Sequence, residues 1–595
     1  MRKRIDKLFA ALLSLALIFT LALPVSFAAD TESKSASPHE LRVISMSDTH
    51  LIPESMIKGT ADYQHALNRD QKVFNEAEAV LDAQLRQVRA TEPDVLLLSG
   101  DLSKDGEYRS HQALARKLRK LKKDMPKLKV YVINGNHDIN NSNGQIFSTA
   151  DGKAVPAKKT SQKQFKALYQ DITWDDTTVV DTYTPPEGAQ AGGLSYVARP
   201  KKGFTVIAID ANRYSPDNTS NGDSEHETGG RMTDDLLTWV LRQTKKAKKR
   251  GDTVIGLMHH GLVAHFTQQP TIMGDFLVKD YQTVSAKLAD AGMHYVFTGH
   301  YHSQDVSVMT TEAGNTLYDI ETGSSITYPC PMRAVQFLRE NIGAADTDNQ
   351  VKETVKGTTI QHLSIAHTDP QTGNYASIPD MTAFSKTKGF RVDVIRTILD
   401  DALTDALGSN YPKALKTALD KLIPDLLNMP VTDDGKYALI DAVNYAHQKH
   451  LAGLDHGSDP AWFKEARQNV KEGRILAAIA DTLSKDLAVL VGDGVNRLTN
   501  TQLIQGPAVD ALYHGLFGAA HVSYFTVPQL AKDFNQFLLK TMDSLTKDKN
   551  FPNDVTFTVT NANKVRPGAE DWSSIANGIP STNIVQLLIG ALLGN

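Results

Sequence analysis

Short apolar runs, rich in β-branched and aromatic residues, recur along the first half of the chain. Residues 129–133 (KVYVI) predict a buried strand, and Gly135 permits a sharp turn directly after it. Runs of the same kind occupy residues 41–47, 95–99, 195–199, 204–210, 253–258 and 294–298. Stretches with apolar residues at helical spacing lie between several of them, at 70–89, 107–123 and 233–249. This alternation predicts an α/β fold.

The pattern changes past about residue 375, where helical stripes replace the alternation. The stripes occupy residues 394–407, 411–427, 436–451, 475–491 and 528–545. They predict an all-α module, with one late strand at 555–559. Just before the change, two runs at 317–322 and 334–339 predict strands that we expect to be antiparallel. No histidine of the helical part follows a predicted strand. We therefore interpret these histidines as structural: His447, His450, His456, His514 and His521.

The N-terminus has the order of a targeting segment. A cationic start (MRKR) precedes an apolar run from Leu8 to Leu23, and Ser26-Phe27-Ala28 fits a cleavage site. This order predicts a signal peptide over residues 1–28, a flexible leader over 29–40, and a secreted or extracytoplasmic protein. A retained N-terminal anchor is the alternative, although the run is short for a membrane span. We expect no stable membrane span after signal removal, because the apolar run 584–593 is also too short.

Length and composition narrow the possibilities. At 595 residues the chain is too long for one hydrophobic core, and we expect one domain over 41–370 and a helical C-terminal domain over 371–595. The formal net charge of −4 gives no reason to expect a nucleic-acid polymer as partner. The single cysteine, Cys330, excludes an intramolecular disulfide, so packing and metal binding must supply the stability.

Five of the predicted strands are followed immediately by residues of the types that bind metals. These side chains are Asp48 and His50, Asp101, the Asn136-His137-Asp138 turn, His259-His260, and His300 with His302. Open α/β sheets bind ligands outside the carboxyl ends of their strands, so the five groups should share one site. One such strand end is a weak signal, but five in one chain predict a metal centre. Imidazoles mixed with carboxylates suit Mn, Fe or Zn, whereas Mg and Ca prefer oxygen ligands.

In these five blocks and their order, the sequence resembles the calcineurin-like metallophosphoesterase superfamily. The blocks are Asp48-x-His50, Gly100-Asp101, Gly135-Asn136-His137-Asp138, His259 and Gly299-His300-x-His302. The resemblance covers roughly Leu41 to Pro370. It implies an α+β sandwich of two sheets flanked by helices, a two-metal centre, and hydrolysis of a small-molecule phosphoester.

The resemblance also implies which residues bind each ion. One ion would be held by Asp48, His50, Asp101 and His302. Asp101 would bridge to a second ion, held by Asn136, His259 and His300. A shared carboxylate holds two cations about 4 Å apart, so both can contact one phosphate. The alternative to His259 is His260, since alternation along a strand points only one of the two inward.

The resemblance also implies a role for His137 next to the metals. In the superfamily the Asn of the Asn-His pair is a ligand and the His faces the phosphate. His137 would therefore stabilise the transition state or protonate the leaving alkoxide. Either Asp105 or Asp138 could orient its ring. The expected substrate contacts are Asn136, His137 and Tyr301, and the loop 212–231 is a candidate lid.

The expected substrate class is based on a similarity to one group within the superfamily. Ser-Asp-Thr-His at 47–50, Met-His-His at 258–260 and Gly-His-Tyr-His at 299–302 resemble the class III cyclic nucleotide phosphodiesterases, which include secreted bacterial members with a helical C-terminal domain. The similarity implies that a hydroxide held between the metals attacks a 3′,5′- or 2′,3′-cyclic nucleotide. A broad phosphomonoesterase or nucleotidase is an alternative, because the same centre handles both ester types. A cell-surface binding protein with a decayed site is a third hypothesis, which the complete ligand set disfavours.

Overall fold

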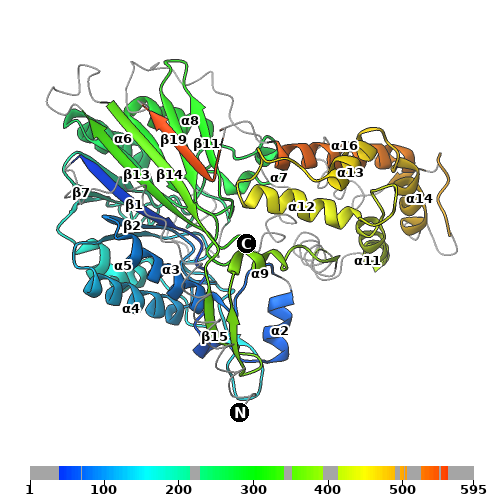
Figure 1. Cartoon of the computed structure of the whole chain (residues 1–595), viewed down its shortest axis with the longest axis horizontal. Coiled ribbons are helices and arrows are strands. Elements are labelled where there is room, and N and C mark those ends of the chain that lie inside the picture. The colour runs from blue at the N-terminus through cyan, green and yellow to red at the C-terminus, as the bar shows by residue number, and fades with distance from the viewer. Residues whose placement is uncertain are drawn as a thin grey trace, which may run out of the picture.

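A computed structural model of the chain shows two packed sheets with helices on their outer faces, and a helical module at one end (Figure 1). The structure describes residues 39–68, 70–214, 228–340, 352–392, 395, 413–488, 496–501, 503–505, 524–547, 551 and 553–560. Outside these residues lie the expected signal peptide, nearly all of the leader, most of the candidate lid, the stripe at 394–407 except residue 395, and the apolar run 584–593.

The first sheet has six strands in the order β19-β14-β13-β1-β2-β3. Its parallel half consists of β1 (Glu40–Met46), β2 (Val95–Ser99) and β3 (Lys129–Ile133). Its antiparallel half consists of β13 (Met332–Glu340), β14 (Lys352–Ile360) and β19 (Thr556–Thr560). The strands predicted at 334–339 and 555–559 are therefore present, and both are antiparallel.

The second sheet has seven strands in the order β11-β12-β10-β9-β8-β7-β6. Four central strands run parallel: β12 (Thr316–Glu321), β10 (Met293–Thr298), β9 (Thr253–Leu257) and β8 (Phe204–Ala208). Antiparallel edges are formed by β11 (Val306–Thr310), β7 (Tyr196–Lys201) and β6 (Val179–Thr182). The strand expected at 317–322 is β12. The expectation that it is antiparallel is right for its pairing with β11 and wrong for its pairing with β10, on the side of the sheet centre. The hairpin partner β11 lies at the edge, so β12 pairs with β10 in parallel.

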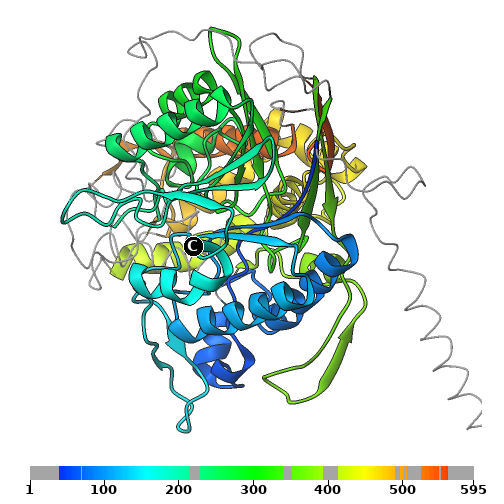
Figure 2. The ribbon, with the colours of Figure 1, turned by 90° about the vertical axis from the view of Figure 1, so that its left-hand side faces the viewer.

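The two sheets face each other, and helices cover both outer faces (Figure 2). One face carries α3 (Ala77–Thr91), α4 (Tyr108–Asp124) and α5 (Gln162–Tyr169), and the other carries α6 (Asp234–Lys249) and α8 (Tyr281–Ala291). Apolar side chains of both sheets form one core, in which the rings of Tyr295 and Phe337 lie 5.4 Å apart. The expected two-sheet sandwich is confirmed.

Shorter elements complete the sandwich. They are η1 (Glu54–Met56), α2 (Ala61–Asn68), β4 (Gln145–Ile146), β5 (Val155–Pro156), η2 (Gln170–Trp174), α7 (Gln269–Ile272) and η3 (Gly274–Phe276). The helix expected from residue 70 begins only at Ala77. Asp70 accepts a hydrogen bond from the backbone N–H of Lys72 at 2.8 Å, and such a turn competes with helix formation.

The helical module has a core of its own, as the amphipathic stripes predicted. It contains α11 (Lys413–Leu427), α12 (Leu439–Leu451), α13 (Ala461–Lys471), α14 (Leu476–Asp486) and α16 (Val527–Thr546). A short hairpin is formed by β17 (Ile504–Gln505) and β18 (Tyr524–Phe525). Helix α13 was not predicted. Phe276 and Tyr301 of the sandwich share the module's core, so the two parts are packed together. Among the described helices, none has the length and apolarity of a membrane span.

The chain leaves the sandwich later than residue 370 and returns to it afterwards. The hairpin of β15 (Ile365–Thr368) and β16 (Tyr375–Ile378) leads to α9 (Met381–Lys386), whose Met381 is buried in the sandwich core. After the module, β19 adds to the edge of the first sheet. The pairing of β14 with β19 joins segments about 200 residues apart and leaves no local pattern in the sequence, and the boundary at residue 371 stays a prediction.

The returning strand should be important for stability. Phe557 of β19 is 4% exposed, and its ring lies against Gly357 and 5.9 Å from the ring of Phe551. Phe557→Ala should lower the free energy of unfolding by about 3 kcal/mol, because it leaves a cavity at the sheet edge. Urea unfolding followed by tryptophan fluorescence measures this change. The exposed neighbour Thr558→Ala is the matched control, and equal stability of both variants would show that β19 adds little.

Candidate metal centre

The strand ends named in the sequence analysis meet where the two sheets face each other. Backbone hydrogen bonds join the first two ends, since the N–H of Asp48 donates to Gly100 O at 3.1 Å and that of His50 to Asp101 O at 2.9 Å. Ser99 Oγ donates to Thr298 O of the other sheet at 3.2 Å. These contacts bring polar side chains from β1, β2 and β10 to one buried place.

The backbone at these strand ends is strained. In the described ranges, ten non-glycine residues have a positive φ, and half of them belong to the expected ligand set. These five are Asp48, His50, Asp101, His300 and His302, with φ between 35° and 75°. A left-handed conformation costs about 1–3 kcal/mol for such residues and persists only where the surroundings enforce it. The strain is therefore concentrated at this one site.

Two glycines leave the space that the carboxylates occupy. A Cβ at Gly299 would overlap Ser47 and the carboxylate of Asp48. A Cβ at Gly135 would overlap the carboxylate of Asp101. These two glycines thus permit close packing of the ligands.

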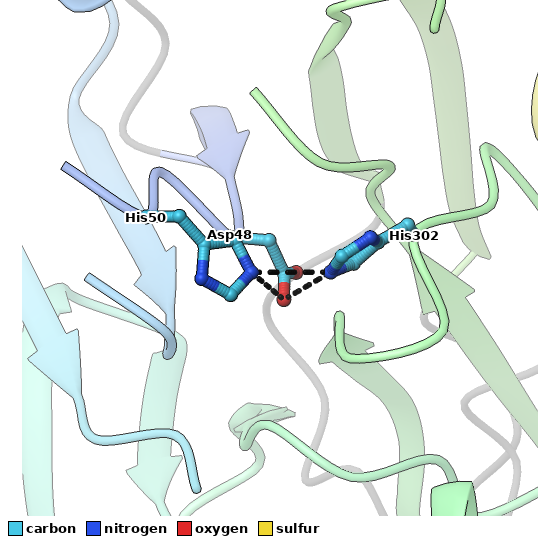
Figure 3. A group of neighbouring side chains, drawn as sticks. All are labelled: Asp48, His50 and His302. Carbon is cyan, nitrogen blue, oxygen red and sulfur yellow. Dashed lines mark hydrogen bonds and ion pairs between the residues drawn. The ribbon is translucent and has the colours of Figure 1, made fainter. Parts of the chain in front are cut away.

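One cluster is formed by Asp48, His50 and His302 (Figure 3). His302 Nε2 lies 3.2 Å from Asp48 Oδ1 and 3.2 Å from His50 Nε2. All three side chains are buried, with at most 1% of each residue exposed. The other carboxylate oxygen, Asp48 Oδ2, accepts hydrogen bonds from Ser47 Oγ at 2.5 Å and from the N–H of His300 at 3.1 Å. This orientation aims Oδ1 at the two imidazoles.

A second cluster is formed by Asp101, His259 and His300. His259 Nε2 lies 3.2 Å from Asp101 Oδ2 and 3.1 Å from Asn136 Oδ1. The opposite ring nitrogen, His259 Nδ1, donates to Ser99 O at 2.7 Å, which turns Nε2 toward the cluster. Asp101 Oδ2 is also 3.9 Å from His50 Nε2 of the first cluster. A single carboxylate oxygen thus lies between the two groups.

The donor set fits two metal ions. Ligand atoms about 2.1 Å from a cation lie about 3.0–3.4 Å from one another, and the closest nitrogen–oxygen and nitrogen–nitrogen distances here are 3.1–3.2 Å. Asp48 Oδ1 and Asp101 Oδ2 are buried and accept no hydrogen bond from any residue that the structure describes. A buried carboxylate oxygen without a donor is costly unless a cation compensates it. The two clusters can therefore bind two metal ions.

The protonation of the imidazoles agrees with this function. Burial lowers the pKa of His50, and the nearby Lys72 ammonium lowers it further. Burial also lowers the pKa of His300 and outweighs the Asp48 carboxylate at His302, so these rings are neutral at pH 7, as metal ligands must be. Burial alone would lower the pKa of His259, but the Asp101 carboxylate raises it to about 9. A cation at this position would displace that proton.

The structure distinguishes the two neighbouring histidines at the end of β9. His259 lies in the second cluster, whereas His260 Nε2 donates to Thr228 O at 3.0 Å. The ring of His260 packs 4.4 Å from that of His300, and burial together with His259 lowers the pKa of His260 to about 3. His260 thus supports a ligand ring from behind.

His137 lies beside both clusters with its ring fixed by Asp105. His137 Nδ1 donates to Asp105 Oδ1 at 3.0 Å, and His137 Nε2 lies 4.0 Å from Asp101 Oδ2. Asp138 has a different task, because its carboxylate accepts from the N–H groups of Leu102, Ser103 and Gly135 at 2.9–3.1 Å. Asp105 is therefore the residue that orients His137, and Asp138 joins two ligand loops.

Electrostatics favour the protonated form of His137. Burial lowers its pKa, but the carboxylates of Asp101 and Asp105 outweigh burial and raise the pKa above its ordinary value. Burial would raise the pKa of Asp105, yet the Lys104 ammonium and His137 hold it below its ordinary value. The pair therefore favours a proton on His137 and a charged Asp105 carboxylate.

Two further residues lie near the site, one predicted from the sequence and one not. Tyr301, an expected substrate contact, is 2% exposed and packs 5.4 Å from both Phe266 and His450, at the junction with the helical module. Sequence reasoning missed Lys72, which is buried in the loop before α3, 3.5 Å from Asp70. A lysine in a polar run carries no signal of such a position.

The match of part of the chain to a family model supports this assignment. Residues 41–304 match the family model described as calcineurin-like phosphoesterase. A dimetal phosphatase from Danio rerio is similar at 14% identity over 50% of this chain and 95% of its own, with a TM-score of 0.33. A 5′-nucleotidase precursor from Thermus thermophilus matches at 11% identity over 67% and 80%, with a TM-score of 0.30. The NAD nucleotidase of Haemophilus influenzae matches at 11% identity over 66% and 62%, with a TM-score of 0.27. A search of curated proteins gave no match.

Residues 41–304 therefore form a calcineurin-like metallophosphoesterase domain, and the protein is a metal-dependent phosphoester hydrolase. The helical module lies beyond the matched residues. The family supplies the reaction class, and the two clusters supply the candidate metal ligands.

The shared carboxylate gives a direct test of the centre. Asp101→Asn should remove bound metal and lower turnover by more than about 100-fold, because it deletes the charge between the two clusters. Metal content by mass spectrometry and turnover of bis-p-nitrophenyl phosphate measure both effects. Asp235→Asn, at an exposed position of α6, is the control. Full metal content with unchanged turnover in Asp101→Asn would exclude the shared site.

Proposed function

We propose that the protein is a two-metal phosphodiesterase that hydrolyses 3′,5′- or 2′,3′-cyclic nucleotides. The observation that carries the proposal is the pair of His137 and Asp105 beside the Asp101 carboxylate. This pair is a proton donor at the edge of a centre that can bind two cations. A cyclic nucleotide needs such a donor, since its leaving group is a sugar alkoxide of high pKa.

The proposed ligands follow from the two clusters. One cation would bind to Asp48, His50, Asp101 and His302, and the other to Asp101, Asn136, His259 and His300. We propose Mn, Fe or Zn, because imidazole nitrogens outnumber carboxylates in the set. When bound, the cations would neutralise charge on the phosphoryl oxygens and make water nucleophilic at neutral pH.

The protein's own residues would then handle the proton. Asp105 holds His137 by its Nδ1–H, so Nε2–H faces the place where the leaving oxygen separates from phosphorus. Burial lowers the pKa of His137, but the Asp101 and Asp105 carboxylates raise it above its ordinary value, which favours retention of that proton. His137 is 5% exposed, which limits exchange of the proton with bulk water. We therefore assign His137 as the general acid.

The place of action rests on the N-terminal sequence. The cationic start and the apolar run before Ser26-Phe27-Ala28 have the order of a signal peptide. We propose that the protein acts outside the cytoplasm on extracellular or periplasmic nucleotides.

A panel of four substrates tests the function on the purified full-length protein. We expect 3′,5′-cAMP or 2′,3′-cAMP and bis-p-nitrophenyl phosphate to be turned over faster than p-nitrophenyl phosphate. His137→Ala should slow the cyclic nucleotide by about 100-fold or more, because general acid catalysis contributes 10²–10⁴-fold, and should affect p-nitrophenyl esters much less. A preference for the monoester would favour the nucleotidase alternative. Equal losses on all substrates would exclude proton donation by His137.

The pair also predicts a pH dependence. The acid form of His137 is the active one, so cyclic-nucleotide turnover should fall as the pH rises through its raised pKa. Asp105→Asn removes a carboxylate that favours the imidazolium, and the fall should therefore move to lower pH. The pH–rate profile of kcat/KM measures the shift, and the exposed Asp151→Asn is the control. An unchanged profile would show that Asp105 does not set the protonation of His137.

A further inference from the structure

A second group of buried metal-binding side chains lies at the junction of the sandwich and the helical module. It consists of Asp305, three residues after His302, together with His450 at the end of α12 and Asp455 in the following turn. One ligand atom from each lies within 4.8 Å of the others. The exposed fractions of the three residues are 0%, 0% and 3%. None of the three residues was predicted as a metal ligand from the sequence.

In each carboxylate of the group, one oxygen has a polar partner and the other has no hydrogen-bond partner among the described residues. Asp305 Oδ1 accepts from His265 Nδ1 at 2.6 Å and from Ser307 Oγ at 3.0 Å. Asp455 Oδ2 lies 2.6 Å from His450 Nδ1. The remaining oxygens, Asp305 Oδ2 and Asp455 Oδ1, are buried and have no hydrogen-bond partner within the described ranges. These are the same signs that mark Asp48 and Asp101 in the main centre.

A further acidic side chain, Asp554, lies beside this group. Asp554, just before β19, is fully buried and has a carboxylate oxygen without a donor among the described residues. Its other oxygen accepts from the N–H of Val306 at 3.0 Å, next to Asp305 in the chain. The buried guanidinium of Arg333 donates to the backbone carbonyls of Asp554, Asp305 and Glu321. Arg333 therefore leaves the carboxylate oxygens themselves without a donor.

We propose that Asp305, His450 and Asp455 bind a further divalent cation, of the Zn²⁺ type, at this junction. One imidazole with two carboxylates is a donor set that borderline cations such as Zn²⁺ prefer, whereas Ca²⁺ prefers oxygen ligands alone. The ion compensates the two buried carboxylate oxygens that have no donor. It is separate from the two clusters of the catalytic centre, because it shares no residue with them.

The ion would fasten the helical module to the loop that carries two catalytic ligands. The N–H of Gln304 donates to Leu451 O at 2.9 Å, so the loop and the end of α12 are already in backbone contact. Gly453 packs so closely that a Cβ there would overlap Gln304 O. His450 and Asp455 belong to the module and Asp305 belongs to the sandwich, so the ion would link the two parts at their junction. Its structural role makes the proposal independent of the substrate.

The test counts metal in the full-length protein saturated with Zn²⁺ and then dialysed. Wild type should retain three equivalents, and Asp455→Asn and His450→Gln should each retain two. His456→Gln, the exposed neighbour of Asp455, is the matched control and should retain three. The two-equivalent variants should also lose the part of the thermal stabilisation by Zn²⁺ that the control keeps.

Crystals of the wild-type protein decide the matter even if the variants fail to fold. Anomalous diffraction at the zinc edge should show a peak between Asp305, His450 and Asp455, in addition to those at the catalytic centre. Two equivalents in solution, with no anomalous peak at the junction, would show that the group is an ion-pair network alone and would overturn the proposal.

Discussion

The Asp101 carboxylate is the constraint on which the catalytic end of the molecule depends. One oxygen accepts the N–H of His137 at 2.8 Å, and the other lies between His50 and His259. Room for it exists only because Gly135 has no side chain. A buried carboxylate is costly unless positive charge nearby compensates it, and here bound cations or protonated imidazoles can do so. Five ligand residues with a left-handed backbone surround this shared oxygen.

The fold could be predicted from the sequence as far as local patterns reach. Strands such as 129–133 and helices such as α4 lie where their periodicity placed them, because burial on one or both faces dictates the residue types. The direction of β12 could not be predicted, since its neighbours are chosen by the arrangement of the whole sheet. The return of β19 to β14 could not be predicted either, because the pairing joins residues about 200 positions apart. The start of α3 was misplaced because a side-chain turn at Asp70 replaces the first helical hydrogen bonds.

The candidate site was predicted in its residue types and less well in its supporting contacts. Strand ends place Asp48, His259 and His302 together, and a short motif carries that information. The choice between Asp105 and Asp138 as the partner of His137 depends on loop geometry, which no spacing rule gives. His450 was interpreted as structural because a helix end far along the chain gives no sign of facing Asp305. Sequence patterns thus identify ligands that follow strands and miss those that tertiary packing supplies.

The return of the chain to the first sheet has a consequence for how the protein is made. A ribosome synthesises the chain from its N-terminus, so β1, β2, β3, β13 and β14 leave it long before β19 does. Until then the edge of β14 has unpaired backbone groups, and an exposed edge strand can pair with another chain. The edge of β14 is therefore uncovered while the helical module is being synthesised. Pairing with the five-residue β19 then replaces a nine-residue edge strand by a shorter one.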